Sequence, residues 1–176
     1  MIERVESEDA YVWLARKSME AYIRTGKKMD VPEGLPQEMY QNRAGVFVSI
    51  KKEGALRGCI GTIQAVYSSI AEEIIFNAIS ASTRDPRFPA VEAGELEWLT
   101  VSVDVLGDME RIDSPDKLDV KHYGVVVTKD CRRGLLLPNL EGVNTIEKQV
   151  AIAKQKAGIG YLEEVQLERF EVVRHL

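Results

Sequence analysis

Hydrophobic residues along the chain follow a helical period in some segments and an extended period in others. Three segments carry apolar residues at helical spacing, and we expect helices at residues 7–24, 69–82 and 144–157. Ser7, Ser69 and Asn144 stand where an N-cap belongs, and the last two have a glutamate three residues on. Gly26 and Gly158 follow the first and third segments and predict their ends.

Other segments alternate apolar and polar residues, or are short β-branched runs bounded by turn residues, which indicates strands. We expect strands at residues 45–51, 55–64, 96–106, 124–128, 135–137 and 165–173. Glu53 and Gly54 predict a hairpin turn between the first two strands, and residues 130–134 a turn between the fourth and fifth. Residues 32–36 and 113–119 are rich in turn formers and predict loops.

Hairpins and strands separated by helices, without regular strand–helix alternation, favour an α+β fold in which helices flank a mostly antiparallel sheet. We find no internal repeat and no segment that resembles a linker. We therefore expect residues 1–176 to form a single domain.

Composition narrows the function classes. The 176 residues include 23 Lys and Arg against 28 Asp and Glu, a formal net charge of −5, which disfavours a nucleic-acid binder. No apolar run approaches the roughly 20 residues of a membrane span, and we expect no membrane partner. The first six residues lack the pattern of a signal peptide, and two cysteines are too few for a disulfide framework. A cytoplasmic location with reduced thiols is the expectation.

The first motif that points to chemistry is Leu56-Arg57-Gly58-Cys59-Ile60-Gly61-Thr62. On a strand, Arg57 and Cys59 share one face, and a nearby arginine favours the thiolate form of a cysteine. Gly58 and Gly61 leave backbone bare for a close approach, so the segment is a candidate nucleophilic or anion-binding site. The alternative is a buried Cys59 that acts as a small apolar residue, with glycines that let a neighbour pack closely.

The second motif is Thr83-Arg84-Asp85-Pro86-Arg87-Phe88-Pro89. The two prolines predict a stiff loop after a helix, from which Arg84 and Arg87 could clamp a carboxylate or phosphate. The alternative is a structural loop in which Asp85 caps backbone or pairs with an arginine.

Other candidates carry weaker signals. Lys129 and Cys131-Arg132-Arg133-Gly134 form a basic turn that suits either an anionic partner or a solvated hairpin tip. His122 and His175 lack the spacing of metal ligands, so we expect no metal, and no cofactor-binding motif is present. A set of acidic residues reads as a solvated face and loops rather than a catalytic pair: Glu95, Glu97, Asp104, Asp108, Glu110 and Asp113.

Four motifs in order resemble the AMMECR-one domain family, whose prokaryotic members are called AmmeMemoRadiSam system protein A. They are Leu56–Thr62, Asp85–Pro89, Gly134-Leu135-Leu136-Leu137-Pro138 and Lys156-Ala157-Gly158, and the resemblance extends from about Val5 to the C-terminus. Two positions depart from the family: Asn139-Leu140 follows the third motif, and Lys154 stands where many members have a cysteine. The second departure weakens any scheme that needs a second thiol there.

The resemblance implies a fold with a larger and a smaller lobe and a cleft between them, with the first motif near the cleft. It also implies two partners, a Memo-type protein and a radical-SAM enzyme, which relatives are encoded beside or fused to. On that basis the residues before Glu6 are a candidate junction of a longer fusion.

Three functions follow from these observations. The first is an enzyme of a modification pathway in which Cys59 is the nucleophile, Arg57 activates it, and Arg84 and Arg87 bind an anionic substrate. The second is a non-catalytic binding module whose cleft holds an anionic ligand or peptide. Arg57, Arg84 and Arg87 bind the ligand in this case, and Gly58, Gly61 and Asp85 shape the site. The third is a nucleic-acid binder associated with RNA modification, which the negative net charge disfavours.

Overall fold

The computed structural model describes residues 8–176 and divides into two compact units. Unit 1 comprises residues 8–106 and 173–176, and unit 2 comprises residues 107–172. Each unit packs one or two α-helices on one face of a four-stranded sheet with antiparallel pairing, which confirms the predicted α+β class. That the chain forms a single domain stays a prediction.

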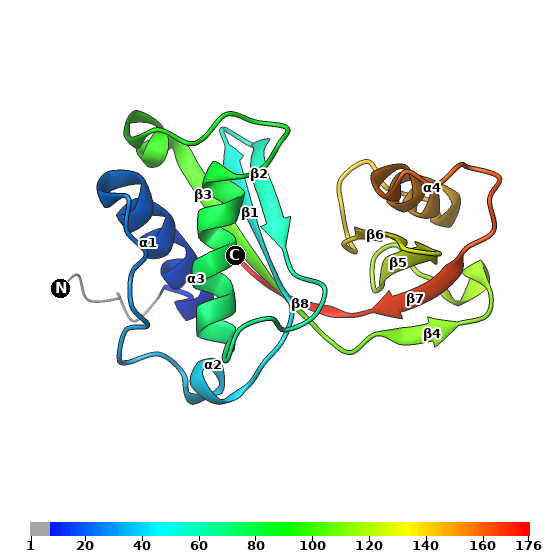
Figure 1. Ribbon diagram of the computed structural model, residues 1–176, viewed down its shortest axis with the longest axis horizontal. Helices are drawn as coiled ribbons and strands as arrows, with labels where there is room; N and C mark the ends of the chain where they lie inside the picture. The colour runs from blue at the N-terminus through cyan, green and yellow to red at the C-terminus, as the bar shows by residue number, and fades with distance from the viewer. Residues whose placement is uncertain (1–7) are drawn as a thin grey trace. The chain divides into compact units, whose positions relative to one another are not determined.

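Unit 1 is built on a sheet with strand order β2-β1-β3-β8. Helices α1 and α3 lie side by side on one face of this sheet (Figure 1). Its elements are α1 (Ala10–Thr25), α2 (Gln37–Gln41), β1 (Val46–Lys52), β2 (Ala55–Gly61), α3 (Ile70–Thr83), the 3-10 helix η1 (Ala93–Trp98), β3 (Leu99–Leu106) and β8 (Val172–His175).

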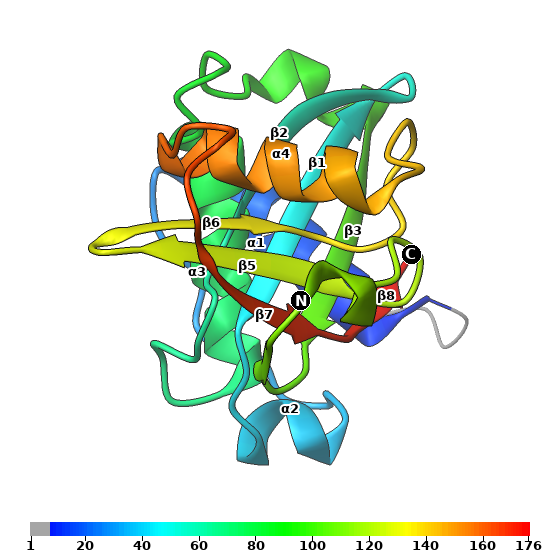
Figure 2. The ribbon, with the colours of Figure 1, turned by 90° about the vertical axis from the view of Figure 1, so that its right-hand side faces the viewer.

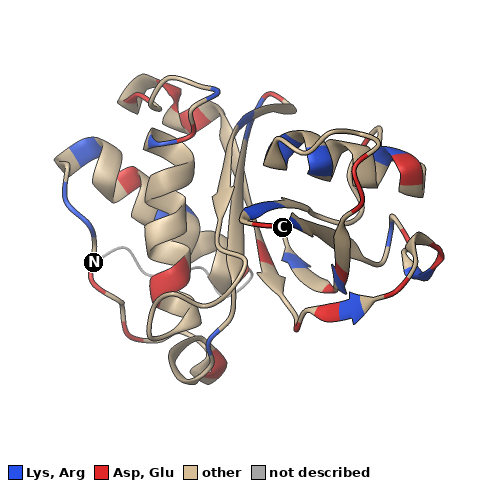
Figure 3. Cartoon of the chain, turned by 45° about the vertical axis from the view of Figure 1, so that its right-hand side comes forward, with Lys and Arg blue, Asp and Glu red and all other residues tan. Residues whose placement is uncertain are grey.

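The core of unit 1 lies between the helices and the sheet. Val46, Val48 and Ile50 alternate along β1 and are fully buried. Helix α3 carries charge only at Glu72 and Glu73 and is tan along most of its length in Figure 3. A helix this apolar is stable only where most of its surface is covered, and α3 packs against α1, β1 and β2.

Unit 2 has the strand order β4-β7-β5-β6, with helix α4 across β5 and β6 (Figure 2). Its elements are β4 (Glu110–Ile112), the 3-10 helix η2 (Pro115–Lys117), β5 (Gly124–Lys129), β6 (Arg132–Leu136), α4 (Ile146–Ala157) and β7 (Gln166–Phe170). Val125, Val127 and Leu167 face α4 in a small separate core.

Most predicted elements are confirmed, but several boundaries move. Helix α1 is capped by Asp9, whose carboxylate accepts from the N–H groups of Tyr11 and Val12; Ser7 lies outside the described residues. Helix α4 is capped by Thr145 rather than Asn144, because the Thr145 hydroxyl reaches the Lys148 N–H at 3.2 Å. Ser69 caps α3 as predicted.

The strand predicted at 165–173 is two strands. It divides at Glu171, and β7 and β8 belong to different sheets. Residues 93–98 form η1, so the strand predicted from residue 96 begins at Leu99. The short elements α2, β4 and η2 were not predicted, because segments of three to five residues leave no measurable period.

Gly58 lets β2 lie directly against α3. A Cβ atom placed on Gly58 would lie 2.1 Å from the carbonyl oxygen of Ala81, a backbone atom of α3. No side chain fits this space, so a residue without one is required where strand and helix meet. The close approach fixes β2 relative to the end of α3, from which the second motif continues.

We predict that Gly58→Ala lowers the free energy of unfolding by about 1–3 kcal/mol, because either β2 or α3 must move. Gly94→Ala is the matched control: a Cβ there meets nothing within 4 Å, and we expect a change below about 1 kcal/mol. Urea denaturation of both variants measures the difference. Equal stability of the two variants would show that the approach is not tight.

Candidate functional site

The first motif occupies β2, which is an edge strand of unit 1. Because successive residues of a strand point to opposite faces, Gly58 faces α3 while Cys59 faces away from it. The Cys59 side chain is partly exposed and forms no disulfide. The tight-packing half of the alternative interpretation is therefore confirmed at Gly58, but the thiol is not buried.

Cys59 lies in a row of small polar side chains that crosses three strands. It pairs in register with Ser49 on β1, which pairs with Ser102 on β3. The Cys59 Sγ and Ser49 Oγ atoms are 3.3 Å apart, within hydrogen-bond distance for sulfur. Sequence reasoning missed Ser49; the signal was its place opposite Cys59 across the predicted hairpin.

The second motif closes the open edge of β2 beside Cys59. One oxygen of the Asp85 carboxylate accepts from the Cys59 N–H at 3.0 Å and from Arg87 Nη2 at 2.7 Å. The other accepts from the backbone N–H and the Nε of Arg87, at 3.1 and 3.0 Å. Arg87 Nη2 also donates to the Cys59 carbonyl at 3.4 Å. An ion pair thus satisfies backbone groups that a further strand would otherwise pair with.

Exposure differs sharply within this ion pair. The Asp85 side chain is 1% exposed, whereas that of Arg87 is 52% exposed. The hydrogen bonds from Arg87, together with that from the Cys59 N–H, lower the pKa of Asp85 from 3.8 to about 2. The pKa of Arg87 is raised, chiefly by its hydrogen bonds to Asp85 and in smaller part by Coulombic attraction to Cys59. Arg87 therefore presents a permanent positive charge both to Cys59 and to solvent.

Arg57 is held by a different set of contacts. The β1–β2 register shifts between Ile50 and Lys51, which leaves Arg57 without a register partner. Its guanidinium donates to both oxygens of Glu95, at 3.0 and 3.1 Å, and to the carbonyls of Pro89 and Ala90, at 2.8 and 3.3 Å. The Arg57 side chain is only 12% exposed. Arg57 thus ties the second motif and η1 to β2.

Glu95 was predicted to lie on a solvated acidic face, and this prediction was wrong. It is part of an ion-pair network rather than of a solvated face, since Lys52 Nζ also donates to it at 3.1 Å. The hydrogen bonds from Arg57, followed by those from Glu92 N–H and Lys52, lower the pKa of Glu95 to about 2. Asp104 is also an ion-pair partner rather than part of a solvated face: it is buried and pairs with Arg174 at 2.7 Å. Nothing local in the sequence marks either partner.

The remaining predicted site residues lie near by but differ in their contacts. Arg84 caps the C-terminal end of α3 and is exposed, and its guanidinium has no partner among residues 8–176. A Cβ on Gly61 would lie 2.3 Å from the Phe47 ring, so packing accounts for this glycine. The alternative interpretation of the second motif is confirmed for Asp85, which both caps backbone and pairs with an arginine.

The basic turn is neutralised within unit 2. The chain reverses at Asp130 and Cys131, and Cys131 is exposed. Lys129 and Arg132 both pair with Glu163, at 2.9 and 3.4 Å. Arg133 pairs with Glu168 at 3.3 Å. The turn is therefore a hairpin tip whose cations already have acidic partners.

The described part of the chain contains neither a cluster of metal ligands nor a helix that could span a membrane. Residues 8–176 hold no group of three or more His, Cys, Asp or Glu side chains arranged to bind a metal ion. His175 instead pairs through Nδ1 with Asp9 at 2.8 Å and stacks on Tyr11. Within the same residues, no helix has the length and apolar character of a membrane span.

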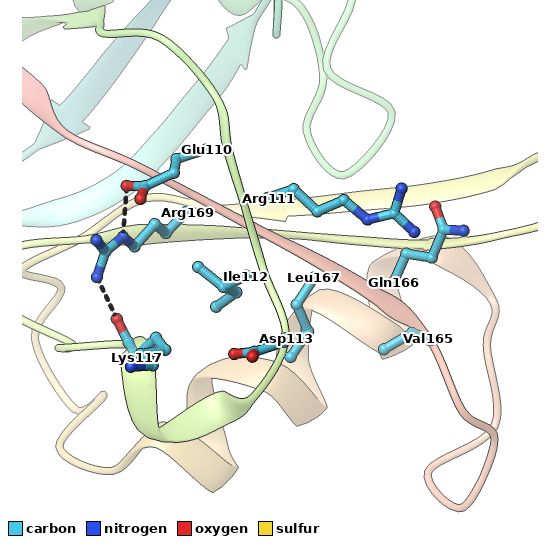
Figure 4. A pocket seen from close by; sticks show the side chains of 9 residues that line it. All are labelled: Glu110, Arg111, Ile112, Asp113, Lys117, Val165, Gln166, Leu167 and Arg169. Atoms are coloured by element: carbon cyan, nitrogen blue, oxygen red, sulfur yellow. Dashed lines mark hydrogen bonds and ion pairs between the residues drawn. The ribbon is translucent and has the colours of Figure 1, made fainter.

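Four grooves are lined by residues of unit 2, and none of these four is lined by Cys59, Arg57 or Arg87. One of about 700 Å³ lies over β4 and β7 (Figure 4). Its Arg169 is already bound, through Nε to Glu110 and through Nη1 to the Lys117 carbonyl, both at 2.8 Å. The candidate site around Cys59 lines none of these four grooves; it comprises a partly exposed thiol on the sheet face of β2 and the Asp85–Arg87 pair at the edge of that strand.

The chain is similar to proteins of one family over nearly its whole length. The AMMECR1 family profile matches residues 12–175. A Thermotoga maritima protein is 47% identical over 170 residues, which covers 96% of this chain and 98% of that protein. A Clostridium acetobutylicum protein is 50% identical over 171 residues, but the chain spans only 36% of its length.

A solved structure is similar throughout. The crystal structure of the uncharacterised protein PH0010 from Pyrococcus horikoshii superposes with a TM-score of 0.87 at 34% sequence identity, and the match covers 93% of this chain and 88% of that one. The fold, the order of the motifs and the extent of the match lead to one assignment: the chain belongs to the AMMECR1 family.

Proposed function

We propose that the chain is the component of a modification pathway that supplies a nucleophilic thiol, Cys59, for an anionic substrate. The observation that carries the proposal is the position of Arg87. Its half-exposed guanidinium is hydrogen-bonded to the Cys59 carbonyl and attracted to the Cys59 side chain. A fixed positive charge beside a thiol favours the thiolate, which is the reactive form.

In the proposed reaction, the Cys59 thiol first loses its proton to solvent. The thiolate then attacks an electrophilic carbon of the substrate; a C–S bond forms, and the leaving group departs with its bonding electron pair. The outer face of Arg87, and Arg84 from the same loop, bind the anionic group of the substrate. A Memo-type protein and a radical-SAM enzyme are the proposed partners, and the family resemblance supports them.

Asp85 and Arg57 act in this scheme as positioning residues. Asp85 holds Arg87 against β2, and Arg57 holds the loop that carries both. Cys59 is the only residue assigned to covalent chemistry.

A second function, a non-catalytic site for an anionic ligand, is favoured by Arg84. Arg84 and Arg87 leave the same short loop, and Arg84 is exposed without a partner among residues 8–176. Cys59→Ala separates the two functions, because it abolishes the first and spares the second.

We predict that iodoacetamide alkylates Cys59 several-fold faster at pH 7 in native Cys131→Ser protein than in the same protein unfolded in urea. The unfolded chain exposes the thiol fully, so a faster native reaction requires a larger thiolate fraction. Mass spectrometry of quenched samples gives both rates. If Cys59 reacts only on unfolding, the nucleophile proposal is wrong and the binding function takes its place.

We predict that Arg87→Gln slows this alkylation about three- to tenfold, because a fixed positive charge beside Cys59 is lost. Arg84→Gln removes the same charge from the same loop and should change the rate less than about twofold. Arg87→Lys separates charge from geometry: it keeps the charge but not the paired hydrogen bonds to Asp85, and should retain most of the rate. Equal effects of Arg84→Gln and Arg87→Gln would contradict the role given to Arg87.

We predict that Asp85→Asn lowers the free energy of unfolding by about 2 kcal/mol at pH 7. The pKa of Asp85 is about 2 when folded, below its ordinary 3.8. Its contribution is therefore complete above pH 3.8 and is lost as pH falls through 3.8 towards 2. Denaturation from pH 7 to pH 2.5 should show the wild-type and Asp85→Asn curves converging at low pH. Asp30→Asn, at an exposed carboxylate of unit 1, should stay parallel to wild type.

A further inference from the structure

The loop that follows α4 exposes two neighbouring large apolar side chains. Tyr161 is 69% exposed and Leu162 is 91% exposed. Single exposed apolar residues are common, but adjacent ones that continue into a groove mark interaction surfaces.

This exposure is not a result of a loosely attached loop. Lys154 Nζ donates to the carbonyls of Tyr161 and Glu163 at 2.9 and 2.8 Å. Glu163 in turn accepts from the Gly160 N–H and pairs with Lys129 across from the hairpin tip. Three charged side chains thus fix the backbone in a position that presents Leu162 outward.

Both residues line a groove of about 720 Å³ between α4 and β7, which we call the α4 groove. Its apolar wall comes from α4 and β7 and the residue before that strand: Ile146, Val150, Val165 and Leu167. It shares Asp113, Val165 and Leu167 with the groove over β4 and β7, where Figure 4 shows these side chains together. The two grooves therefore adjoin at these three residues.

The charge on the α4 groove has one dominant sign. Four carboxylates line it, against the single ammonium of Lys154, which is directed at carbonyls. Of the four, Asp113, Glu147 and Glu164 are exposed and have no ion-pair partner among the described residues. Figure 3 shows acidic residues both at the start of α4 and in the loop that follows it.

We propose that the α4 groove docks a peptide segment of a partner protein in which one or two apolar side chains are flanked by Lys or Arg. The apolar side chains cover Leu162 and Ile146, and the flanking cations meet the unpaired carboxylates. A second copy of the chain is a poorer occupant, because a symmetric contact through this face would set its own carboxylates against each other. The proposal concerns unit 2 and does not depend on the chemistry of Cys59.

The test uses the ¹⁵N-labelled 176-residue chain titrated with two synthetic pentapeptides, acetyl-Lys-Leu-Ile-Lys-Leu-amide and the same peptide with Glu in place of Lys. We expect the basic peptide to shift the amide signals of residues 146–151 and 161–167, and the acidic peptide to bind at least about tenfold more weakly. Leu162→Ser should weaken the basic peptide about tenfold. Val66→Ser, at a 64% exposed apolar residue of unit 1, should leave its binding unchanged. Well-dispersed spectra show that both variants are folded.

Three outcomes would overturn the proposal. Equal affinity for the two peptides would show that the carboxylates do not select the ligand. Binding of the basic peptide at other residues, or no binding, would show that the α4 groove is not a docking site. Concentration-dependent dimerisation in sedimentation equilibrium that Leu162→Ser abolishes assigns the groove to a second copy of the chain instead.

Discussion

The carboxylate of Asp85 joins the edge strand β2 to the loop that follows α3 and carries Arg87. It accepts from a backbone N–H of the edge strand and from the arginine two residues along its own loop. Without it, β2 would present an open edge, and Arg87 would lose the contact that holds it beside Cys59. The position of Arg87, whose charge interacts with the Cys59 side chain, thus depends on a carboxylate that is itself almost completely buried.

Arg57 makes the second set of contacts between β2 and the loop that follows α3. Its role differs from those of its neighbours Gly58 and Cys59 in the same motif. The shift in the β1–β2 register frees Arg57 from the strand pairing, and its guanidinium secures Glu95 and the loop carbonyls. Gly58 removes a side chain where α3 touches the strand. Cys59, one residue later, faces the other side of the sheet. A bulge, a glycine with no room for a side chain and a partly exposed thiol therefore occupy three consecutive positions.

The fold class and the long helices could be predicted because each depends on a local pattern of apolar residues. The caps were harder: Asp9 and Thr145 each stand one or two residues from the predicted cap, and only backbone conformation selects between adjacent cap-forming residues. In the site, the sequence predicted that Arg57, Cys59, Arg84 and Arg87 act together, with Gly58, Gly61 and Asp85 shaping the site. It could not indicate that Arg57 binds Glu95 or that Ser49 lies 3.3 Å from Cys59, because both depend on long-range pairing.

Unit 2 contains the same kind of close contact between a strand glycine and a helix as unit 1. A glycine in a shared motif can therefore be required by packing rather than by chemistry. A Cβ on Gly134 of β6 would lie 2.1 Å from the Ala153 carbonyl of α4, as one on Gly58 would from the Ala81 carbonyl of α3. The third motif therefore has a packing explanation at its glycine, and so do Gly61, Asp85 and Arg57 in the first two. Family resemblance at these positions supports the fold alone. Among the candidate site residues of the first two motifs, packing leaves three groups accessible for chemistry: the Cys59 thiol, the outer face of Arg87 and the Arg84 guanidinium.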